Sequence, residues 1–365
     1  MAGVGGCGRR RRLGASEPGT GLQGRIDRVH QDSHDHLPHE NHAVGGWDER
    51  AAVAQGETED RATFKNAVRR RNSEKTSTLY STYRNDKSAY GGVTMTAATS
   101  SSPASGRSID VNGVALYYEE QGEGDPLIHG GLGSSARWQA VLPHLVDGFR
   151  VITPDSRGHG RSTNPAGELS YPLIADDVAA LIAALGLERP VVGGWSDGGQ
   201  VALELGARHP GVAGGLIVGA AYPDFDGSGL RETWKGLLGA DDAGTPDLAQ
   251  LDENLGDFAG VVKSLHPGGT QQWQALLQQT APMWLDYAGL TPDDLRGIAA
   301  PALVLAEDRD ELIPLDLMVA LYRALPNAEL AICPQADHFG PGTPERAGVF
   351  AGIIRDFAGR HTQAR

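Results

Sequence analysis

The chain has 365 residues, of which 40% are hydrophobic, and this is enough to bury a sizeable core. Its formal net charge is −14, and the acidic excess lies in residues 95–365, which carry 34 Asp and Glu against 17 Lys and Arg. This balance argues against a nucleic-acid partner, because phosphate binding needs clustered basic side chains. No apolar run approaches the ~20 residues of a membrane span, so no membrane partner is expected. The two cysteines imply no disulfide framework.

Residues 1–105 lack the pattern of a folded unit. Apolar side chains are too sparse there to offset the entropy lost on ordering, so we expect a disordered tail. Arg9–Arg12 is not followed by the apolar segment of an export signal, which favours a cytoplasmic protein. The histidines between His30 and His42 are interpreted as part of a solvated tail, not as a metal site. Met95 is a candidate start of the native protein.

From Ser108 onward, apolar runs typical of strands alternate with helical patterns. The expected strands are Ser108–Val111, Val114–Glu120, Pro126–His129, Arg150–Pro154, Pro190–Gly194, Gly215–Ala220, Ala302–Ala306 and Glu329–Cys333. The expected helices are Ala136–Val146, Ile174–Leu185, Gln200–Arg208, Asp316–Ala324 and Pro344–Phe357. Such alternation predicts an α/β fold with a mainly parallel eight-stranded sheet and helices on both faces. The first two strands form a hairpin around Asn112-Gly113 and add an antiparallel edge.

Between Tyr222 and Pro301 the alternation lapses and only helical patterns remain. They lie at Gly229–Leu238, Pro246–Leu265 and Thr270–Asp286. A helical insertion between two parallel strands most simply covers their carboxyl ends, where open α/β sheets bind ligands. We therefore expect a core formed by residues 106–223 and 301–365, and a helical cap formed by residues 224–300.

The fifth expected strand leads into Gly194-Trp195-Ser196-Asp197-Gly198, with a glycine two residues before and two residues after the serine. Such a strand, turn and helix holds the central residue in a strained conformation and lifts its hydroxyl clear of the sheet. The five-residue pattern alone is weak, so its meaning depends on the rest of the chain.

A serine hydroxyl becomes a good nucleophile when a base takes its proton and an acid orients that base. Suitable groups follow two later strands. Asp308 and Asp310 follow the seventh expected strand, and His338 follows the eighth. Since the carboxyl ends of parallel strands meet at one edge of a sheet, these groups are candidates to act with Ser196.

Residues 108–360 resemble a cap-bearing alpha/beta-hydrolase. The motifs that carry the resemblance are His129-Gly130-Gly131, the segment from Pro154 to Ser162, the serine turn, the acid turn and Asp337-His338. The order of nucleophile, acid and base matches that family. The resemblance implies Asp310 rather than Asp308 as the acid, because Asp310 lies four residues before Pro314. It further implies an oxyanion hole formed by the backbone N–H groups of Gly131 and Asp197.

The serine turn is also similar to that of the biphenyl-hydrolase-like group, which includes amino-acid esterases of the valacyclovir-hydrolase type. That likeness implies that the Asp197 carboxylate contacts a substrate ammonium group; alternatively, it complements the dipole of its helix. Trp195 and Trp284 are expected to contact the substrate. The insertion side chains Trp234, Trp273, Met283, Trp284 and Tyr287 either line the pocket or pack the cap helices together.

Together these features predict a carboxylesterase-like serine hydrolase that cleaves a small-to-medium carboxylic ester, such as an amino-acid ester, through an acyl-enzyme. No cofactor and no metal are expected, and the expected partner is a small-molecule ester. Two alternatives stay open: a lactonase or carbon–carbon bond hydrolase with the same triad, and a hydrolase fold that only binds a ligand. The sequence gives no indication of the oligomeric state.

Overall fold

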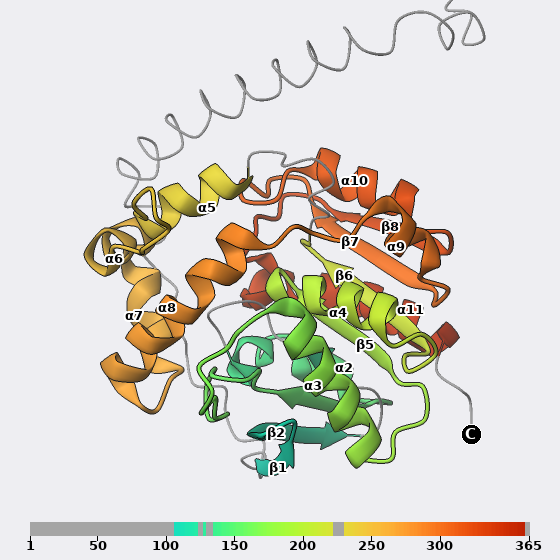
Figure 1. Cartoon of the computed structure of the whole chain (residues 1–365). Helices are drawn as coiled ribbons and strands as arrows, with labels where there is room; N and C mark the ends of the chain where they lie inside the picture. The colour runs from blue at the N-terminus through green and yellow to red at the C-terminus, as the bar shows by residue number, and fades with distance from the viewer. Residues whose placement is uncertain (1–105, 123–126, 129–133, 222–229, 362–365) are drawn as a thin grey trace, which may run out of the picture. The chain divides into compact units, whose positions relative to one another are not determined.

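The computed structural model describes residues 106–122, 127–128, 134–221 and 230–361 (Figure 1). The expectations for the tail, for Met95 and for Gly131 concern residues outside these ranges.

The described strands confirm the α/β fold with a mainly parallel sheet. One hydrogen-bonded group contains β1 (Arg107–Val111), β2 (Val114–Gly122) and β4 (Arg150–Pro154), paired antiparallel in the order β1-β2-β4. The other is parallel, in the order β3-β5-β6-β7-β8, and contains β3 (Leu127–Ile128), β5 (Val191–Trp195), β6 (Gly215–Gly219), β7 (Ala302–Glu307) and β8 (Ala328–Cys333). The expected single sheet is therefore two hydrogen-bonded groups in the described residues, and β3 is only two residues long.

The strand sequences explain this arrangement. Every residue of β5, β6 and β7 is buried, as expected for parallel strands covered on both faces. The β1–β2 hairpin turns at Asn112 and Gly113, whose φ angles are 47° and 77°. Positive φ at both central residues is the geometry for which an Asn-Gly pair is preferred.

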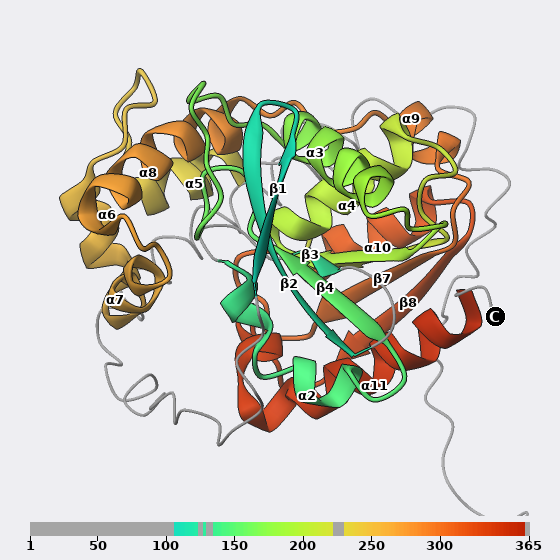
Figure 2. The ribbon, with the colours of Figure 1, turned by 90° about the horizontal axis from the view of Figure 1, so that it is seen from below.

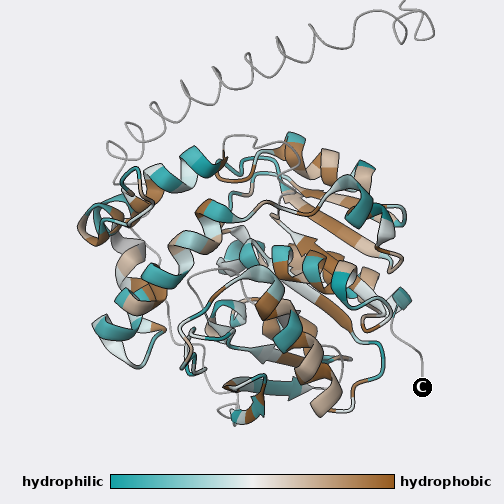
Figure 3. Cartoon of the chain, in the orientation of Figure 1, coloured by the Kyte–Doolittle hydropathy of each residue, from teal (hydrophilic) through white to brown (hydrophobic). Residues whose placement is uncertain are grey.

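Helices cover both faces of the sheet. Figure 2 shows α3 (Tyr171–Ala184), α4 (Asp197–Arg208), α9 (Pro292–Gly297) and α10 (Leu315–Ala324) on one face. The opposite face carries α2 (Leu142–Leu145) and α11 (Pro344–His361). In Figure 3 the parallel strands are largely brown, which places the hydrophobic core between these two layers.

Two expected helices are each divided in the structure. The expected helix Ala136–Val146 is a 3₁₀ helix, η1 (Ser135–Trp138), followed by the separate α2. Pro143 lies in the first turn of α2, where its missing N–H costs nothing, but it would break a continuous helix. The expected helix Pro246–Leu265 is broken at Gly256, whose φ of 55° lies outside the helical region.

The helical insertion between β6 and β7 contains four helices in the described residues before α9. They are α5 (Leu230–Leu238), α6 (Leu248–Leu255), α7 (Asp257–Ser264) and α8 (Gly269–Asp286). The short helix α9 was not expected from the sequence. It begins at a capping box in which Thr291 and Asp294 satisfy each other's backbone N–H groups. Within the described part of the chain, no helix has both the length and the apolar character needed to cross a membrane.

Candidate active site

Ser196 lies between β5 and α4 in the strained conformation that the glycine spacing predicts. Its φ is 57° and its ψ is −117°, and its backbone N–H donates to the carbonyl of Gly219 at 2.9 Å. A Cβ on Gly194 would lie 2.2 Å from the backbone carbon of Gly198, so a larger residue at that position would collide. The missing side chain at Gly194 therefore permits the close approach that the turn requires, and the hydrogen bond to Gly219 of β6 fixes Ser196 to the sheet.

Asp310 and His338 meet at the carboxyl ends of β7 and β8. His338 Nδ1 lies 2.7 Å from Asp310 Oδ2. Asp310 Oδ1 accepts hydrogen bonds from the backbone N–H groups of Leu312, at 2.9 Å, and Ile313, at 2.8 Å. Both side chains are largely buried, so the carboxylate is fixed before any ligand binds.

Asp308 has a different partner. Its Oδ1 accepts a hydrogen bond from the backbone N–H of Ala336 at 3.3 Å, which ties the loop after β7 to the loop after β8. Of the two aspartates that the sequence left as candidates, Asp310 is the one bonded to the His338 ring.

Ser196 and His338 line a common cavity of about 90 Å³. The other lining residues in the described part of the chain are Arg137, Trp138, Trp195, Trp234, Leu237, Leu255, Trp284, Leu312, Phe339, Pro341 and Gly342. None of these is an Asp or a Glu. The wall is thus mainly aromatic and aliphatic, a common character of sites for small organic ligands.

The tryptophans expected near the substrate lie in different positions. Trp195, Trp234 and Trp284 line the cavity, whereas Trp273 is buried beside His266, with the ring centroids 5.8 Å apart. The indole N–H of Trp195 donates to the carbonyl of His338 at 2.9 Å. Trp195 therefore also holds the loop that carries the histidine.

The Asp197 carboxylate is bonded to two neutral protein donors. Tyr171 Oη donates to Oδ1 at 2.6 Å, and Trp284 Nε1 lies 3.1 Å from each carboxylate oxygen. Burial raises the pKa of Asp197, and the two hydrogen bonds and the His338 charge offset only part of this effect. Asp197 is not among the residues that line the cavity.

A further set of contacts that the sequence did not indicate joins the end of α8 to α4. Tyr287 Oη donates to Glu204 at 2.5 Å and accepts from Gln200 Nε2 at 2.7 Å. The rings of Tyr287 and Tyr171 meet edge to face, with their centroids 4.7 Å apart. These contacts fix the C-terminal end of α8 close to the serine turn. The sequence offered one local indication of these contacts, the aromatic residues near the end of the insertion.

Glu307 is a buried acid beside this site. It is the last residue of β7 and is paired in register with Cys333 of β8. Neither carboxyl oxygen meets a hydrogen-bond donor of another residue in the described part of the chain. Burial, with smaller contributions from the charges of Asp310 and Asp337, raises the pKa of Glu307 to about 10. Glu307 therefore keeps its proton at neutral pH.

The described residues contain no cluster of three or more His, Cys, Asp or Glu side chains that could hold a metal ion. Burial, followed by the charge of Glu307, raises the pKa of the Cys333 thiol to about 12. A thiol of this kind is a poor nucleophile at neutral pH, because the thiolate is the reactive form.

The strained serine follows one strand of a parallel sheet, and the hydrogen-bonded Asp–His pair follows two later strands. This arrangement is typical of one class of hydrolases. The sequence model of the alpha/beta hydrolase family matches residues 127–351, and the chain belongs to that family.

Similar proteins have several activities. The chain is 29% identical to the 2-hydroxymuconate semialdehyde hydrolase of Pseudomonas sp. (strain CF600), over 71% of this chain and 96% of that protein. It is similar to the solved structure of a thermophilic esterase from Thermogutta terrifontis, at 26% identity and a TM-score of 0.56, over 71% of this chain and all of that one. A second similar structure, at 26% identity and a TM-score of 0.55, is Est816, described as an N-acyl homoserine lactone degrading enzyme. That match covers 69% of this chain and all of Est816.

Proposed function

We propose that the protein is a serine hydrolase that cleaves a small-to-medium carboxylic ester through an acyl-enzyme. Ser196 is the nucleophile, His338 the general base and Asp310 the acid that orients the histidine. The observation that carries this proposal is a strained serine and an aspartate-bonded histidine on the wall of one cavity. Membership of the alpha/beta hydrolase family supports it.

The mechanism follows from the hydrogen bond between His338 and Asp310. Because Nδ1 of His338 donates to Asp310, the tautomer leaves Nε2 as the acceptor for the proton of Ser196. The serine oxygen attacks the ester carbonyl, and His338 then protonates the leaving alcohol. Water, deprotonated by His338, attacks the acyl-enzyme and releases the acid. Asp310 stabilises the imidazolium form in both steps.

The oxyanion hole forms part of the same proposal. Asp197 is the first residue of α4, and its backbone N–H follows the nucleophile directly. The second donor that the family resemblance implies is Gly131, which lies outside the described residues. Two preorganised donors stabilise the negative charge that develops on the carbonyl oxygen during attack.

An amino-acid ester is a weaker candidate substrate than an ester without an ammonium group. An ammonium group would have to reach the Asp197 carboxylate, which already accepts from Tyr171 and Trp284. The described residues of the cavity wall include no carboxylate that could offer the ammonium group a counter-charge.

A carbon–carbon bond hydrolase is the second candidate. Its support is the similarity to 2-hydroxymuconate semialdehyde hydrolase, which extends over 96% of that relative. A lactonase is a related option, supported by the similarity to Est816. Each would use the same serine and histidine, so only the preferred substrate distinguishes them.

The test is a substrate panel measured with wild-type protein and Ser196→Ala. We expect wild-type turnover of p-nitrophenyl esters, and a loss of about 10⁴-fold or more in kcat for the variant, because the covalent step is removed. Melting curves check that both proteins are folded. Turnover that survives in Ser196→Ala would contradict the proposal. A ligand-induced rise in Tm without turnover of any substrate in the panel would instead support a binding protein.

A further inference from the structure

Tryptophans are concentrated on the wall of the cavity that holds Ser196 and His338. Four of the six tryptophans in the chain line it: Trp138, Trp195, Trp234 and Trp284. Trp138 and Trp195 belong to the core, on η1 and β5, and the other two belong to the insertion, on α5 and α8. A molecule bound at Ser196 therefore meets indole rings from both parts of the chain.

Two of these rings are fixed through their own indole N–H groups. Trp195 donates to the carbonyl of His338 at 2.9 Å, and Trp284 donates to the carboxylate of Asp197 at 3.1 Å. The rings of Trp284 and Trp234 contact each other, with their centroids 5.1 Å apart and their planes inclined by 36°. Because the N–H groups of Trp195 and Trp284 already bond to the protein, these side chains offer a ligand their apolar ring surface.

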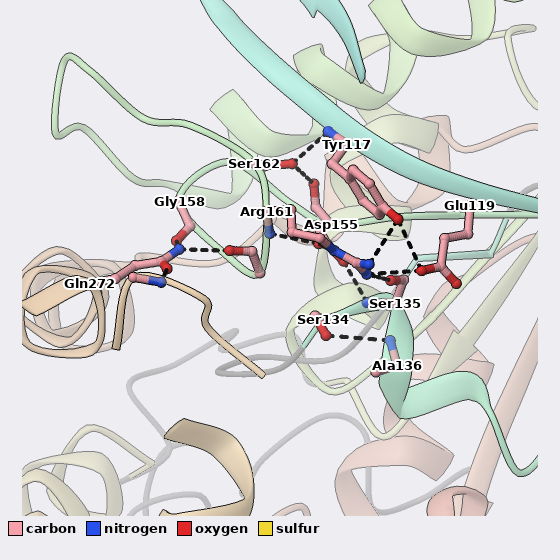
Figure 4. A network of polar contacts seen from close by, with 12 residues as sticks. Tyr117, Glu119, Ser134, Ser135, Ala136, Asp155, Gly158, Arg161, Ser162 and Gln272 are labelled. Carbon is pink, nitrogen blue, oxygen red and sulfur yellow. Dashed lines mark hydrogen bonds and ion pairs between the residues drawn. The ribbon is translucent and has the colours of Figure 1, made fainter. Parts of the chain in front are cut away.

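The turn that carries Trp138 is held by a buried aspartate (Figure 4). The backbone N–H of Ser135 donates to Asp155 Oδ1 at 2.8 Å, and the side chain of Ser134 caps η1. Arg161 Nη2 also donates to Ser135 Oγ at 3.1 Å. Asp155 is fully buried, so these bonds fix the position of η1. The indole N–H of Trp138 itself makes no hydrogen bond within the described part of the chain.

Fixed aromatic side chains favour an aromatic ligand for two reasons. The face of an aromatic ring is electron-rich and its edge is electron-poor, so a second ring gains edge-to-face or offset contacts that a saturated ring cannot make. A benzene ring is also flat, whereas a cyclohexane ring with the same number of carbons is puckered and thicker. Side chains that are already held in place accommodate the thicker ring less well, and they lose little entropy when the flat ring binds.

We propose that the preferred esters carry a benzene ring, in the acyl or the alcohol part, and that the tryptophans of the cavity wall bind this ring. This proposal rests on the proposed function, because it assumes hydrolysis at Ser196. It adds the class of substrate, aromatic esters instead of purely aliphatic ones. It also makes Trp138 a specificity-determining residue that the proposed mechanism does not use.

The test uses two pairs of esters that differ only in the ring. Methyl phenylacetate is compared with methyl cyclohexylacetate, and benzyl acetate with cyclohexylmethyl acetate. We expect wild-type protein to favour the aromatic ester by more than about 3-fold in kcat/KM in at least one pair, which then shows the part of the ester that the tryptophans bind. Burial of apolar surface alone would favour the cyclohexyl ester, which has more of it. A smaller ratio in both pairs would overturn the proposal.

Two variants of Trp138 separate the aromatic contact from the lost volume. Neither removes a hydrogen bond of the described structure, and leucine and phenylalanine are similar in size, but only phenylalanine keeps a ring. In Trp138→Leu the ratio for the preferred pair should fall by about 3- to 10-fold, the range for the loss of one aromatic contact, whereas Trp138→Phe should keep most of it. An equal fall in the two variants would show selection by size alone and would contradict the proposal.

Tyr322→Leu is the control for an aromatic side chain away from the cavity, because Tyr322 is exposed on α10 and should leave the ratio unchanged. Melting curves check that each variant is folded. The same leucine and phenylalanine substitutions at Trp234 repeat the comparison on the insertion, with the same expected difference between the two.

A binding measurement separates this proposal from the proposed function. 2-Phenylethanol should raise the Tm of Ser196→Ala more than 2-cyclohexylethanol does at the same concentration, and adding Trp138→Leu should remove most of this difference. If esters are turned over at Ser196 without a preference for the aromatic ring, the proposed function stands and the aromatic specificity is wrong. If no ester is turned over but the binding preference depends on Trp138, the aromatic site stands and the hydrolase proposal fails.

Discussion

The two walls of the cavity differ in chemistry. The core wall supplies the reactive and charged side chains, Ser196, His338 and Arg137. The wall formed by the helical insertion supplies Trp234, Leu237, Leu255 and Trp284, with no charged side chain among the described lining residues. The core thus contributes the hydroxyl, imidazole and guanidinium groups of the described wall, whereas the insertion contributes apolar and aromatic surface.

The two walls are also held differently. On the core wall, Ser196 is fixed by a hydrogen bond to β6, and Asp310 by two backbone N–H groups. On the insertion wall, Trp284 is held by a hydrogen bond to the Asp197 side chain, and side-chain contacts of Tyr287 fasten the end of α8 nearby. Backbone contacts hold a group in place whatever the neighbouring side chains are, so we expect the insertion wall to be more sensitive than the core wall to substitution of the side chains that hold it.

The largest expected effect is on turnover, and it comes from Asp310, which bonds to the histidine of the core wall. Asp310→Asn should lower kcat by about 10³- to 10⁴-fold, because an amide can hold the histidine in the wrong tautomer and cannot stabilise its cation. Asp308→Asn is the matched control and should lose less than about 10-fold, since Asp308 bonds to a backbone N–H instead. Steady-state kinetics of both variants decide this, and an equal loss in the two would contradict the assignment.

An intermediate effect is expected where the two walls meet. Trp284→Phe removes the indole donor to Asp197 but keeps an aromatic side chain, so kcat/KM should fall by about 10-fold. Asp197→Ala removes the acceptor and keeps the backbone N–H. If the two variants act through this contact, the double variant should lose less than the two single losses combined. Fully additive losses would show that the walls are not coupled there.

A separate effect is expected on stability, not on turnover, and it comes from Glu307 at the end of β7. The pKa of Glu307 is raised to about 10 in the folded protein, whereas an exposed glutamate has a pKa of 4.5. Between these two pH values the folded protein keeps the proton of Glu307, and the unfolded chain releases it. The contribution of this group to stability is therefore fully present below pH 4.5 and is lost as the pH rises toward 10. The slope is up to about 1.4 kcal/mol per pH unit.

Calorimetry of Glu307→Gln measures this effect, because glutamine has no proton to lose. The Tm of the variant minus that of wild type should increase steadily between pH 6 and pH 9. Asp242→Asn is the control: the hydrogen bond from Lys235 lowers the pKa of Asp242, so its contribution is lost only in acid. Its Tm difference should be constant over the same range. A constant difference for Glu307→Gln would contradict its buried, protonated state.

The sequence was sufficient where the determining contacts are local. The serine turn follows from glycines within two residues of Ser196, and the α/β fold follows from buried strand patterns that repeat along the chain. Asp310 and His338 could be placed near each other because the ends of adjacent parallel strands meet.

The sequence was insufficient where contacts span long separations. The partners of the Asp197 carboxylate are 26 residues before it and 87 residues after it, and no local pattern connects them. Arg137 was assigned to a longer helix. Its actual position depends on Pro143 nearby and on a bond from Ser135 to Asp155, 20 residues further along the chain. The expected oxyanion donor Gly131 stays a prediction.

The most direct test of Ser196 as the nucleophile is intact-mass analysis after incubation with a fluorophosphonate, followed by peptide mapping. We expect one adduct per wild-type chain, located on Ser196, slower labelling of Asp310→Asn, and no adduct on Ser196→Ala. A wild-type protein that is folded but takes no label, or an adduct that persists in Ser196→Ala, would contradict it.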